Sequence, residues 1–196
     1  MRALTLIPLA LVALAGCSAV RVVNTDEPPP DTAAPTSPTP VLPPANPMHL
    51  ADAFDYVAHP NDEAGYYFTT PSGRWRCAII PRVKAGCQSA SQSGLGIAGA
   101  PDAVPDATGE QTAPNAIVIE PDGDAHFAAL EQPEFALSPG PANVLPFNRT
   151  LIAARFRCNV QEATGISCLS EQSGRGFTFS ADGFLPQYSE VPVDAP

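Results

Sequence analysis

The chain has 196 residues, with 20 acidic and 10 basic side chains, and a formal net charge of −10 at pH 7. Such an acidic protein has no general affinity for nucleic acid or for anionic lipid headgroups. Proline occurs 24 times and is unevenly distributed, because nine of the twenty residues from Pro28 to Pro47 are proline. After the N-terminal signal and linker segments described below, about 150 residues remain, which suffice for one domain with a substantial buried core.

The first sixteen residues have the pattern of a secretory signal peptide. Arg2 precedes an apolar stretch, 3–14, that is too short to span a bilayer as a stable helix. The run Leu14-Ala15-Gly16-Cys17 resembles the lipobox of bacterial lipoproteins, in which the thiol receives a diacylglyceryl group before cleavage. We expect Cys17 to be lipidated, with acyl chains such as palmitate that hold the protein on the extracytoplasmic face of the cell membrane. An ordinary signal peptide that happens to carry a cysteine is the alternative.

Residues 17–46 form a proline-rich tether in this interpretation, because they contain too few large apolar side chains to order themselves. A short helix is expected next. Asn46 is a suitable N-cap before Pro47, and Leu50, Phe54 and Val57 recur on one apolar face. We expect this face to pack against the domain that follows.

From residue 60 onward the pattern changes to short strands joined by turns. Strands are expected over 66–70, 74–80, 116–120, 125–130, 151–158, 166–170 and 176–180. The segment 88–115 is interpreted as a long exposed loop, and 186–196 as a flexible tail. The predicted fold is therefore mainly β: one domain over 47–185, a small disulfide-stapled sandwich or partly open barrel with one short N-terminal helix. Its expected core comprises Trp75, Ile79, Ile117, Ile119, Phe127, Leu151, Phe156, Ile166, Phe177 and Phe179.

The predicted domain contains one motif twice. Arg74-Trp75-Arg76-Cys77 is followed ten residues later by Cys87, and Arg155-Phe156-Arg157-Cys158 is followed ten residues later by Cys168. Four cysteines in an exported domain indicate two disulfides, for which three pairings exist. Local pairing, Cys77–Cys87 and Cys158–Cys168, is the prediction because each repeat is then self-contained. A four-thiolate zinc site is the alternative, although its usual ligand spacing differs.

Two stretches resemble small secreted or lipid-anchored envelope proteins of actinobacteria. The first is Phe68-Thr69-Thr70-Pro71-Ser72-Gly73-Arg74-Trp75-Arg76-Cys77 with Gly86-Cys87, and the second runs from Leu145-Pro146-Phe147 to Gly176-Phe177-Thr178-Phe179-Ser180. The resemblance covers about residues 65–185 and implies a cysteine-hairpin domain of unknown function in the cell envelope. It implies no activity. Members often carry further cysteines in the middle of the domain, which this chain lacks.

Alternate residues of a strand face opposite ways, so the arginines of each motif point away from its aromatic and cysteine side chains. If both hairpins lie in one sheet, Arg74, Arg76, Arg155 and Arg157 form a basic face that suits an anionic envelope polymer or a lipid headgroup. An envelope protein is a further expected partner of the module. A solvated face paired with acidic residues is the plainer alternative.

The expected function is a non-catalytic binding or interaction module, without cofactor or metal, attached to the membrane through Cys17. A second hypothesis is an envelope hydrolase or transferase whose site includes His126 with Glu120 or Asp124. The sequence holds no nucleophile motif that would support this second hypothesis directly.

Overall fold

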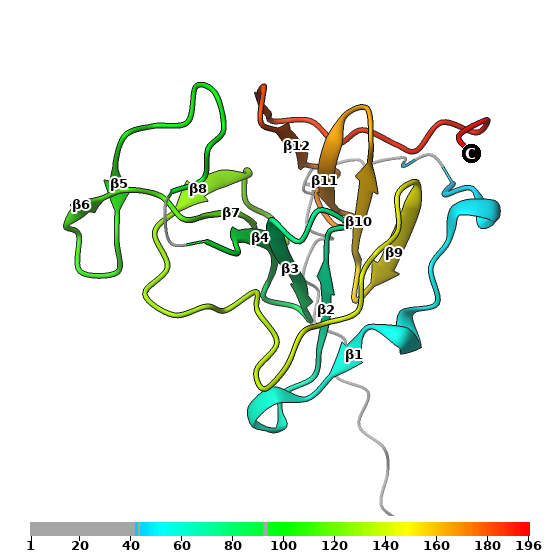
Figure 1. Ribbon diagram of the computed structural model, residues 1–196, viewed down its shortest axis with the longest axis horizontal. Helices are drawn as coiled ribbons and strands as arrows, with labels where there is room; N and C mark the ends of the chain where they lie inside the picture. The colour runs from blue at the N-terminus through cyan, green and yellow to red at the C-terminus, as the bar shows by residue number, and fades with distance from the viewer. Residues whose placement is uncertain (1–41, 43, 92–93) are drawn as a thin grey trace, which may run out of the picture. The chain divides into compact units, whose positions relative to one another are not determined.

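The computed structural model describes residues 42, 44–91 and 94–196. The expected signal peptide, Cys17 and most of the expected tether lie outside these residues. The described part is mainly β, as predicted, and its two main sheets pack face to face without closing into a barrel (Figure 1). None of its helical segments is long and apolar enough to cross a membrane.

Within the described residues, the first main sheet has six antiparallel strands in the order β1-β2-β3-β4-β7-β8, and the second has five in the order β13-β12-β11-β10-β9. The first comprises Val57–Ala58 (β1), Gly65–Thr69 (β2), Trp75–Ile80 (β3), Lys84–Ser89 (β4), Ala116–Ile119 (β7) and His126–Ala128 (β8). The second comprises Arg149–Ala153 (β9), Phe156–Gln161 (β10), Gly165–Ser170 (β11), Gly176–Ser180 (β12) and Gly183–Leu185 (β13). Val104–Pro105 (β5) and Gln111–Thr112 (β6) form a separate two-stranded hairpin, with β5 next to β8 of the first sheet.

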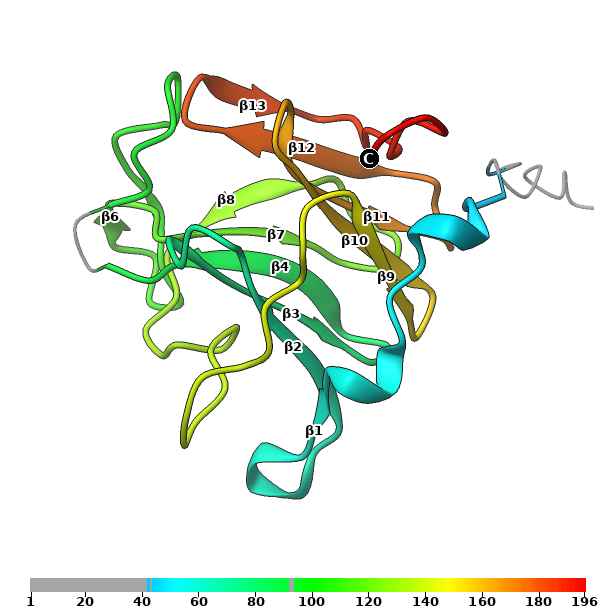
Figure 2. The ribbon, with the colours of Figure 1, turned by 45° about the vertical axis from the view of Figure 1, so that its right-hand side comes forward.

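The sequence repeat corresponds to a structural repeat. β2, β3, β4, β7 and β8 are neighbours in chain order in the first sheet, as β9 to β13 are in the second. In each half a disulfide joins the second strand to the third, and a three-residue turn connects them. The two halves are therefore the same five-strand meander, packed one on the other (Figure 2).

The core lies between the sheets. Of the ten predicted core residues, nine are buried and Phe127 is partly buried against them. The rings of Trp75 and Phe179 meet edge to face with centroids 4.6 Å apart, which ties the first sheet to the second. The alternation of apolar side chains along each strand thus predicted the inner faces correctly.

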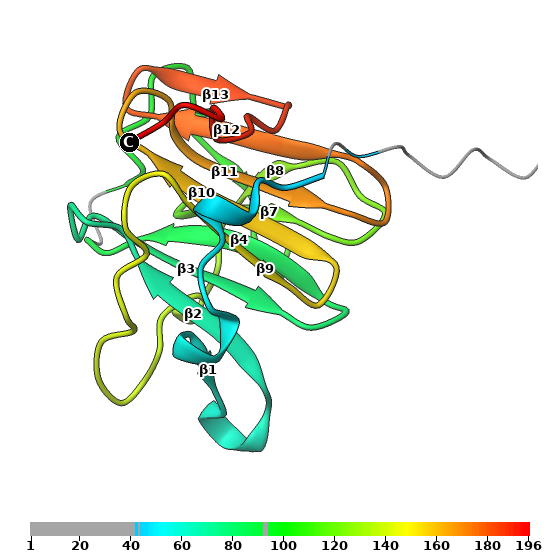
Figure 3. The same ribbon diagram turned by 90° about the vertical axis from the view of Figure 1, so that its right-hand side faces the viewer.

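The outer faces of the two sheets differ. On the first, Phe135 is fully buried against Tyr67, Ala78 and Val118. A Cβ at Gly86 would lie 2.7 Å from the Phe135 ring, so the missing side chain makes room for it. The outer face of the second sheet is buried but polar, and the C-terminal chain runs across it (Figure 3).

The predicted N-terminal helix is wrong. The segment forms two three-residue 3-10 turns, η1 (Pro47–His49) and η2 (Ala53–Asp55), although Asn46 does cap the first through its side chain. Leu50 is 41% exposed and Phe54 is 85% exposed, so the proposed apolar face does not form. Instead the Ala51 amide donates to the Thr150 carbonyl (2.9 Å), which covers the edge of β9.

The tail and the loop also differ from their predictions. The first part of the tail, residues 186–191, packs on the second sheet, where Val191 is buried. Asn159 of β10 donates to the Tyr188 hydroxyl (2.9 Å) and to the Ser189 carbonyl (2.8 Å). The loop at 88–115 contributes Leu95 and Ile97 to the core and contains the β5–β6 hairpin.

The expected strand over 151–158 is two strands, β9 and β10. Ala154 (φ 47°) and Arg155 (φ 65°) form a tight turn between them, and Ala153 pairs with Phe156. Two successive residues with positive φ define the hairpin turn that usually requires glycine or asparagine. The sequence carries neither, so the turn was missed.

Candidate functional site

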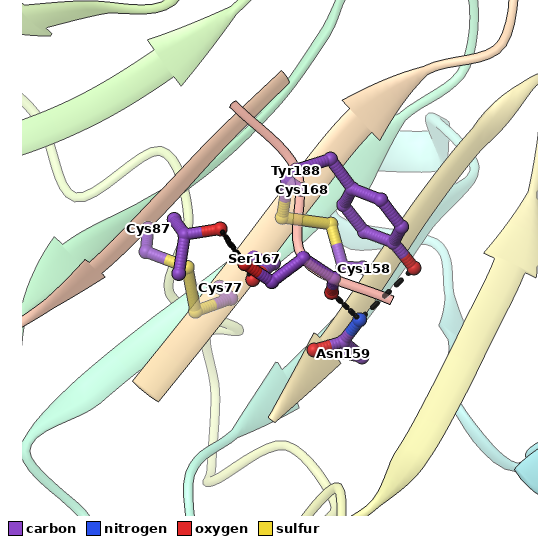
Figure 4. The surroundings of a disulfide bond; sticks show 9 residues. Cys77, Cys87, Cys158, Asn159, Ser167, Cys168 and Tyr188 are labelled. Carbon is purple, nitrogen blue, oxygen red and sulfur yellow. Dashed lines mark hydrogen bonds between the residues drawn. A yellow bond between two sulfur atoms is a disulfide. The ribbon is translucent and has the colours of Figure 1, made fainter. Parts of the chain in front are cut away.

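Each disulfide joins residues that lie directly opposite each other in a hairpin. Cys77 is in register with Cys87, and Cys158 with Cys168; in both pairs the Cα atoms are 4.1 Å apart. All four side chains are fully buried in the core between the sheets (Figure 4). The predicted local pairing is confirmed, and no thiolate is left for the alternative zinc site. The disulfides therefore serve as staples rather than as a reactive site.

The predicted basic face is wrong, because the two hairpins lie in different sheets. Arg76 lies on the outer face of the first sheet, and Arg157 on the outer face of the second, since the cysteines next to them all point into the core. Arg74 and Arg155 are exposed, but Arg157 is only 6% exposed. Its guanidinium donates to Glu171 at 2.8 Å. The four guanidinium groups cannot bind one ligand together.

His126, the residue of the hydrolase or transferase hypothesis, is half exposed on the edge strand β8. Its Nδ1 lies 3.7 Å from a carboxylate oxygen of Glu120 and 3.2 Å from the Asp124 carbonyl. The Asp124 carboxylate instead lies 3.2 Å from Arg175. The two contacts of His126 lie within the β7–β8 turn, and no serine or cysteine of the described residues is hydrogen-bonded to the imidazole.

The structure shows a different candidate site, on the outer face of the first sheet. A cavity of about 440 Å³ lies between the ends of β3 and β4 and the loop at 130–133. This volume is within the usual range for small-ligand sites. Its described lining includes Arg76 and Gln88 on the sheet, Ser89 and Ser91 beside them, and Glu131 on the loop.

The loop wall of this cavity is held by Asn115. The side chain of Asn115 donates through Nδ2 to the Leu130 carbonyl (2.8 Å) and accepts from the Leu130 amide (2.9 Å). Its backbone amide donates to Ala128, and its carbonyl accepts from Ser89. One residue thus fastens the loop to both β4 and β8, so the cavity is formed before any ligand arrives.

Two polar groups in the cavity lack partners. Arg76 and Gln88 face each other in register across β3 and β4. Arg76 is exposed, and its guanidinium forms no hydrogen bond or ion pair with any described residue. Gln88 is 8% exposed, and its Oε1 is buried without a partner among those residues. A buried acceptor without a donor costs about 1–3 kcal/mol of stability.

The neighbouring cation on β4 is already neutralised. Lys84 forms an ion pair with Glu134 and lies over the ring of Phe135. Arg76, unlike Lys84, has no ion-pair partner among the described residues and is available to a ligand on this part of the sheet.

A second cavity, about 320 Å³ in volume, also borders Arg76. Apart from Arg76 and Thr69 its described lining is apolar or glycine, with Phe135, Leu137 and Ala142 prominent. Arg76 thus lies at the boundary between a polar and an apolar compartment.

A third cavity, of about 400 Å³, lies on the other sheet between β11, β12 and the C-terminal chain, and contains Arg157 and Tyr188. Its cation is less suited to bind a ligand. Arg157 is bonded to Glu171 and Glu190, and burial raises the pKa of Tyr188 above its ordinary range. We interpret these groups as the attachment of the C-terminal chain.

Comparison with known proteins adds no candidate function. No protein-family model matches the chain, and neither the curated proteins nor the solved structures include a significant match.

Sequence reasoning selected Arg76 but missed Gln88. The signal was present, because pairing Cys77 with Cys87 in an antiparallel hairpin places Arg76 opposite Gln88. In the second half of the domain, the residue opposite Arg157 is the apolar Leu169, so the equivalent position there is not polar. The walls at 130–142 could not be found in this way, because no local pattern places that loop over the sheet.

Proposed function

We propose that this protein is a lipid-anchored, non-catalytic binding module of the cell envelope, and that its ligand site is the cavity lined by Arg76 and Gln88. The observation that carries the proposal is the exposed guanidinium of Arg76, which has no ion-pair partner among the described residues and borders a cavity walled by the loop at 130–133. A non-catalytic role is supported by the described lining, which includes no histidine or cysteine and has its carboxylate, Glu131, on an exposed loop.

The anchor is supported by the sequence at Leu14-Ala15-Gly16-Cys17 and by the proline-rich segment after it. Extended polyproline of that length reaches roughly 90 Å, so the domain could contact ligands well away from the membrane surface. Metabolic labelling with a fatty-acid analogue tests the anchor. The wild-type protein should incorporate the label and Cys17→Ala should not; equal labelling of both would contradict lipidation.

The ligand site is tested by crosslinking in the cells that produce the protein. A photoreactive residue at Gln132, an exposed residue on the cavity wall, should give a defined adduct that disappears when Arg76→Gln is added. The matched control is the same photoreactive residue at Glu162, exposed in the β10–β11 turn of the other sheet. The same adducts from both positions, or an adduct that is independent of Arg76, would contradict the proposal.

A further inference from the structure

Resting on that proposed function, we infer that the site binds a small amphiphile with a single negative charge. The anionic group of this ligand lies at Arg76, and its aliphatic or aromatic group lies in the second, apolar cavity. The buried Oε1 of Gln88 takes no part in the contact. The inference thus names the chemical class of the ligand from the two surfaces that meet at one arginine.

Arg76 occupies the middle of a row of residues that runs across the outer face of the first sheet. It pairs with Thr69 of β2 on one side and with Gln88 of β4 on the other. The apolar cavity includes Thr69, the polar cavity includes Gln88, and both include Arg76. A ligand bound to the guanidinium can therefore extend toward β2 and place its remaining atoms in the apolar cavity.

The charge of the ligand follows from Arg76 and its surroundings. The guanidinium is exposed and has no ion-pair partner among the described residues, and it presents parallel N–H donors that match the two oxygens of a carboxylate. The protein as a whole has a net charge of −10, and Glu131 also borders the polar cavity. A polyanion would be repelled by these charges, whereas a single compact anion meets the least repulsion for its contact with Arg76.

The apolar part of the ligand is matched by a recess whose wall is already fixed. The Thr69 amide donates to the Asn143 carbonyl (2.9 Å), and the Thr69 carbonyl accepts from the Leu145 amide (2.9 Å), so the end of the loop is bonded to β2. The wall residues with accessible apolar surface are Leu137, Pro141 and Ala142. Methylene groups buried against this wall add affinity that a bare anion does not gain.

The ligand side of the test uses the unmodified protein. The full mature chain, purified in detergent, is titrated with hexanoate, hexanamide and hexanedioate, and protein NMR measures each dissociation constant. Hexanoate should bind at least about tenfold more tightly than hexanamide, which lacks the charge-assisted hydrogen bonds. It should exceed hexanedioate by a similar factor, because the second carboxylate of hexanedioate would lose its hydration in the apolar cavity. Equal affinity for hexanoate and either of the other ligands would overturn the inference.

Chain length gives a second measure of the apolar contact. Butanoate should bind several-fold more weakly than hexanoate, because each buried methylene group contributes up to about fourfold in affinity. Equal affinity for butanoate and hexanoate would show an anion site with no place for an apolar group, and so would inorganic phosphate that binds as tightly as hexanoate. Either result would overturn the inference.

Three variants locate the site, and uptake of the ligand by the detergent is common to all of them. Arg76→Gln should weaken hexanoate about tenfold and leave hexanamide unchanged. Ala142→Leu should fill part of the apolar cavity, so it should weaken hexanoate several-fold and leave acetate unchanged. Arg74→Gln, the matched control, removes the same charge two residues away and should not alter the affinity for hexanoate. Equal losses for Arg74→Gln and Arg76→Gln, or equal losses of acetate and hexanoate in Ala142→Leu, would overturn the assignment.

Failure of this inference is distinguishable from failure of the proposed function. If hexanoate does not bind but the Gln132 crosslink still depends on Arg76, the binding module remains and its ligand belongs to another chemical class. If the Arg76-dependent crosslink is also absent, both proposals fail.

Discussion

Arg157 and Glu171 form a two-pronged contact on the outer face of the second sheet: Nε and Nη2 of the guanidinium donate to one carboxylate oxygen at 3.0 and 2.8 Å. A third donor, Nη1, reaches Glu190 in the C-terminal chain at 3.3 Å. The arginine at the equivalent place in the first half, Arg76, has no such partner among the described residues. The two halves repeat the motif, yet one arginine fastens the chain and the other faces a cavity.

This difference predicts opposite effects of the same substitution on stability. Arg157→Gln should lower the free energy of unfolding by about 2–4 kcal/mol, because it leaves Glu171 and Glu190 without their shared, nearly buried cation. Arg76→Gln should change it by less than about 0.5 kcal/mol, as is usual for an exposed position. Urea unfolding of both variants checks this, and similar losses would contradict the assignment.

The second prediction concerns alkaline pH. Burial, followed by the charge of Glu190, raises the pKa of Tyr188, so the folded protein retains the phenolic proton where an unfolded chain, with a tyrosine pKa of about 10, releases it. The unfolded state then binds fewer protons, and stability falls as the pH rises above about 10. Tyr188→Phe should abolish that part of the fall.

The readout is the urea midpoint of both proteins at pH 8 and pH 11. At pH 8 the variant should be less stable by about 1 kcal/mol, since Asn159 keeps its bond to Ser189 and loses only the one to the hydroxyl. The difference should shrink or reverse at pH 11. A constant difference at both pH values would show that Tyr188 does not titrate differently on unfolding.

The third prediction uses the strained turn between β9 and β10. Ala154 and Arg155 both have positive φ, which costs an ordinary residue roughly 1–2 kcal/mol. The double substitution Ala154→Asn and Arg155→Gly introduces the asparagine-glycine pair that this turn prefers. It should raise the free energy of unfolding by about 1–2 kcal/mol, measured by thermal unfolding. The control, Glu162→Asn with Ala163→Gly in the longer β10–β11 turn, should give no comparable gain.

The fourth prediction concerns the disulfides. Each closes a loop of about eleven residues, and the chain-entropy model gives about 2–3 kcal/mol of stability for each. Non-reducing peptide mapping should recover Cys77 with Cys87 and Cys158 with Cys168. Because the sulfurs are fully buried, both bonds should resist mild reductant until the protein unfolds. Rapid reduction in the folded state would contradict the core position of the two hairpins.

The fifth prediction tests the packing that shapes the candidate site. Gly86→Ala should displace Phe135, because the new Cβ would lie 2.7 Å from its ring and closer still to the Ile117 carbonyl. We expect a loss of about 2–3 kcal/mol in stability and weaker binding at Arg76. Gly123→Ala, in the β7–β8 turn and with φ outside the left-handed region, is the milder control. Equal effects would show that Gly86 has no special role in supporting the loop.

Sequence alone determined the features that depend on neighbouring residues. The alternation of aromatic, arginine and cysteine predicted the inner faces, and the ten-residue spacing predicted the disulfide hairpins. The sequence also contained a signal for the β9–β10 turn. Leu151 and Ala153 place the buried side chains at odd-numbered positions, whereas Phe156 and Cys158 place them at even-numbered positions. A two-residue turn must therefore separate the two strands. By contrast, the helical spacing of Leu50, Phe54 and Val57 was overridden, because a short helix is marginal alone and the edge of β9 offered hydrogen bonds to an extended chain.

Only the tertiary structure decided what Arg76 and Arg157 do. Their local sequences are nearly the same, and strand periodicity places both on outer faces. What covers each face comes from segments distant in sequence: the loop at 130–142 over the first sheet and the chain at 186–191 over the second. The glutamates bonded to Arg157 and the cavity walls beside Arg76 are long-range contacts, and no local pattern of side chains specifies which distant segment packs on which face.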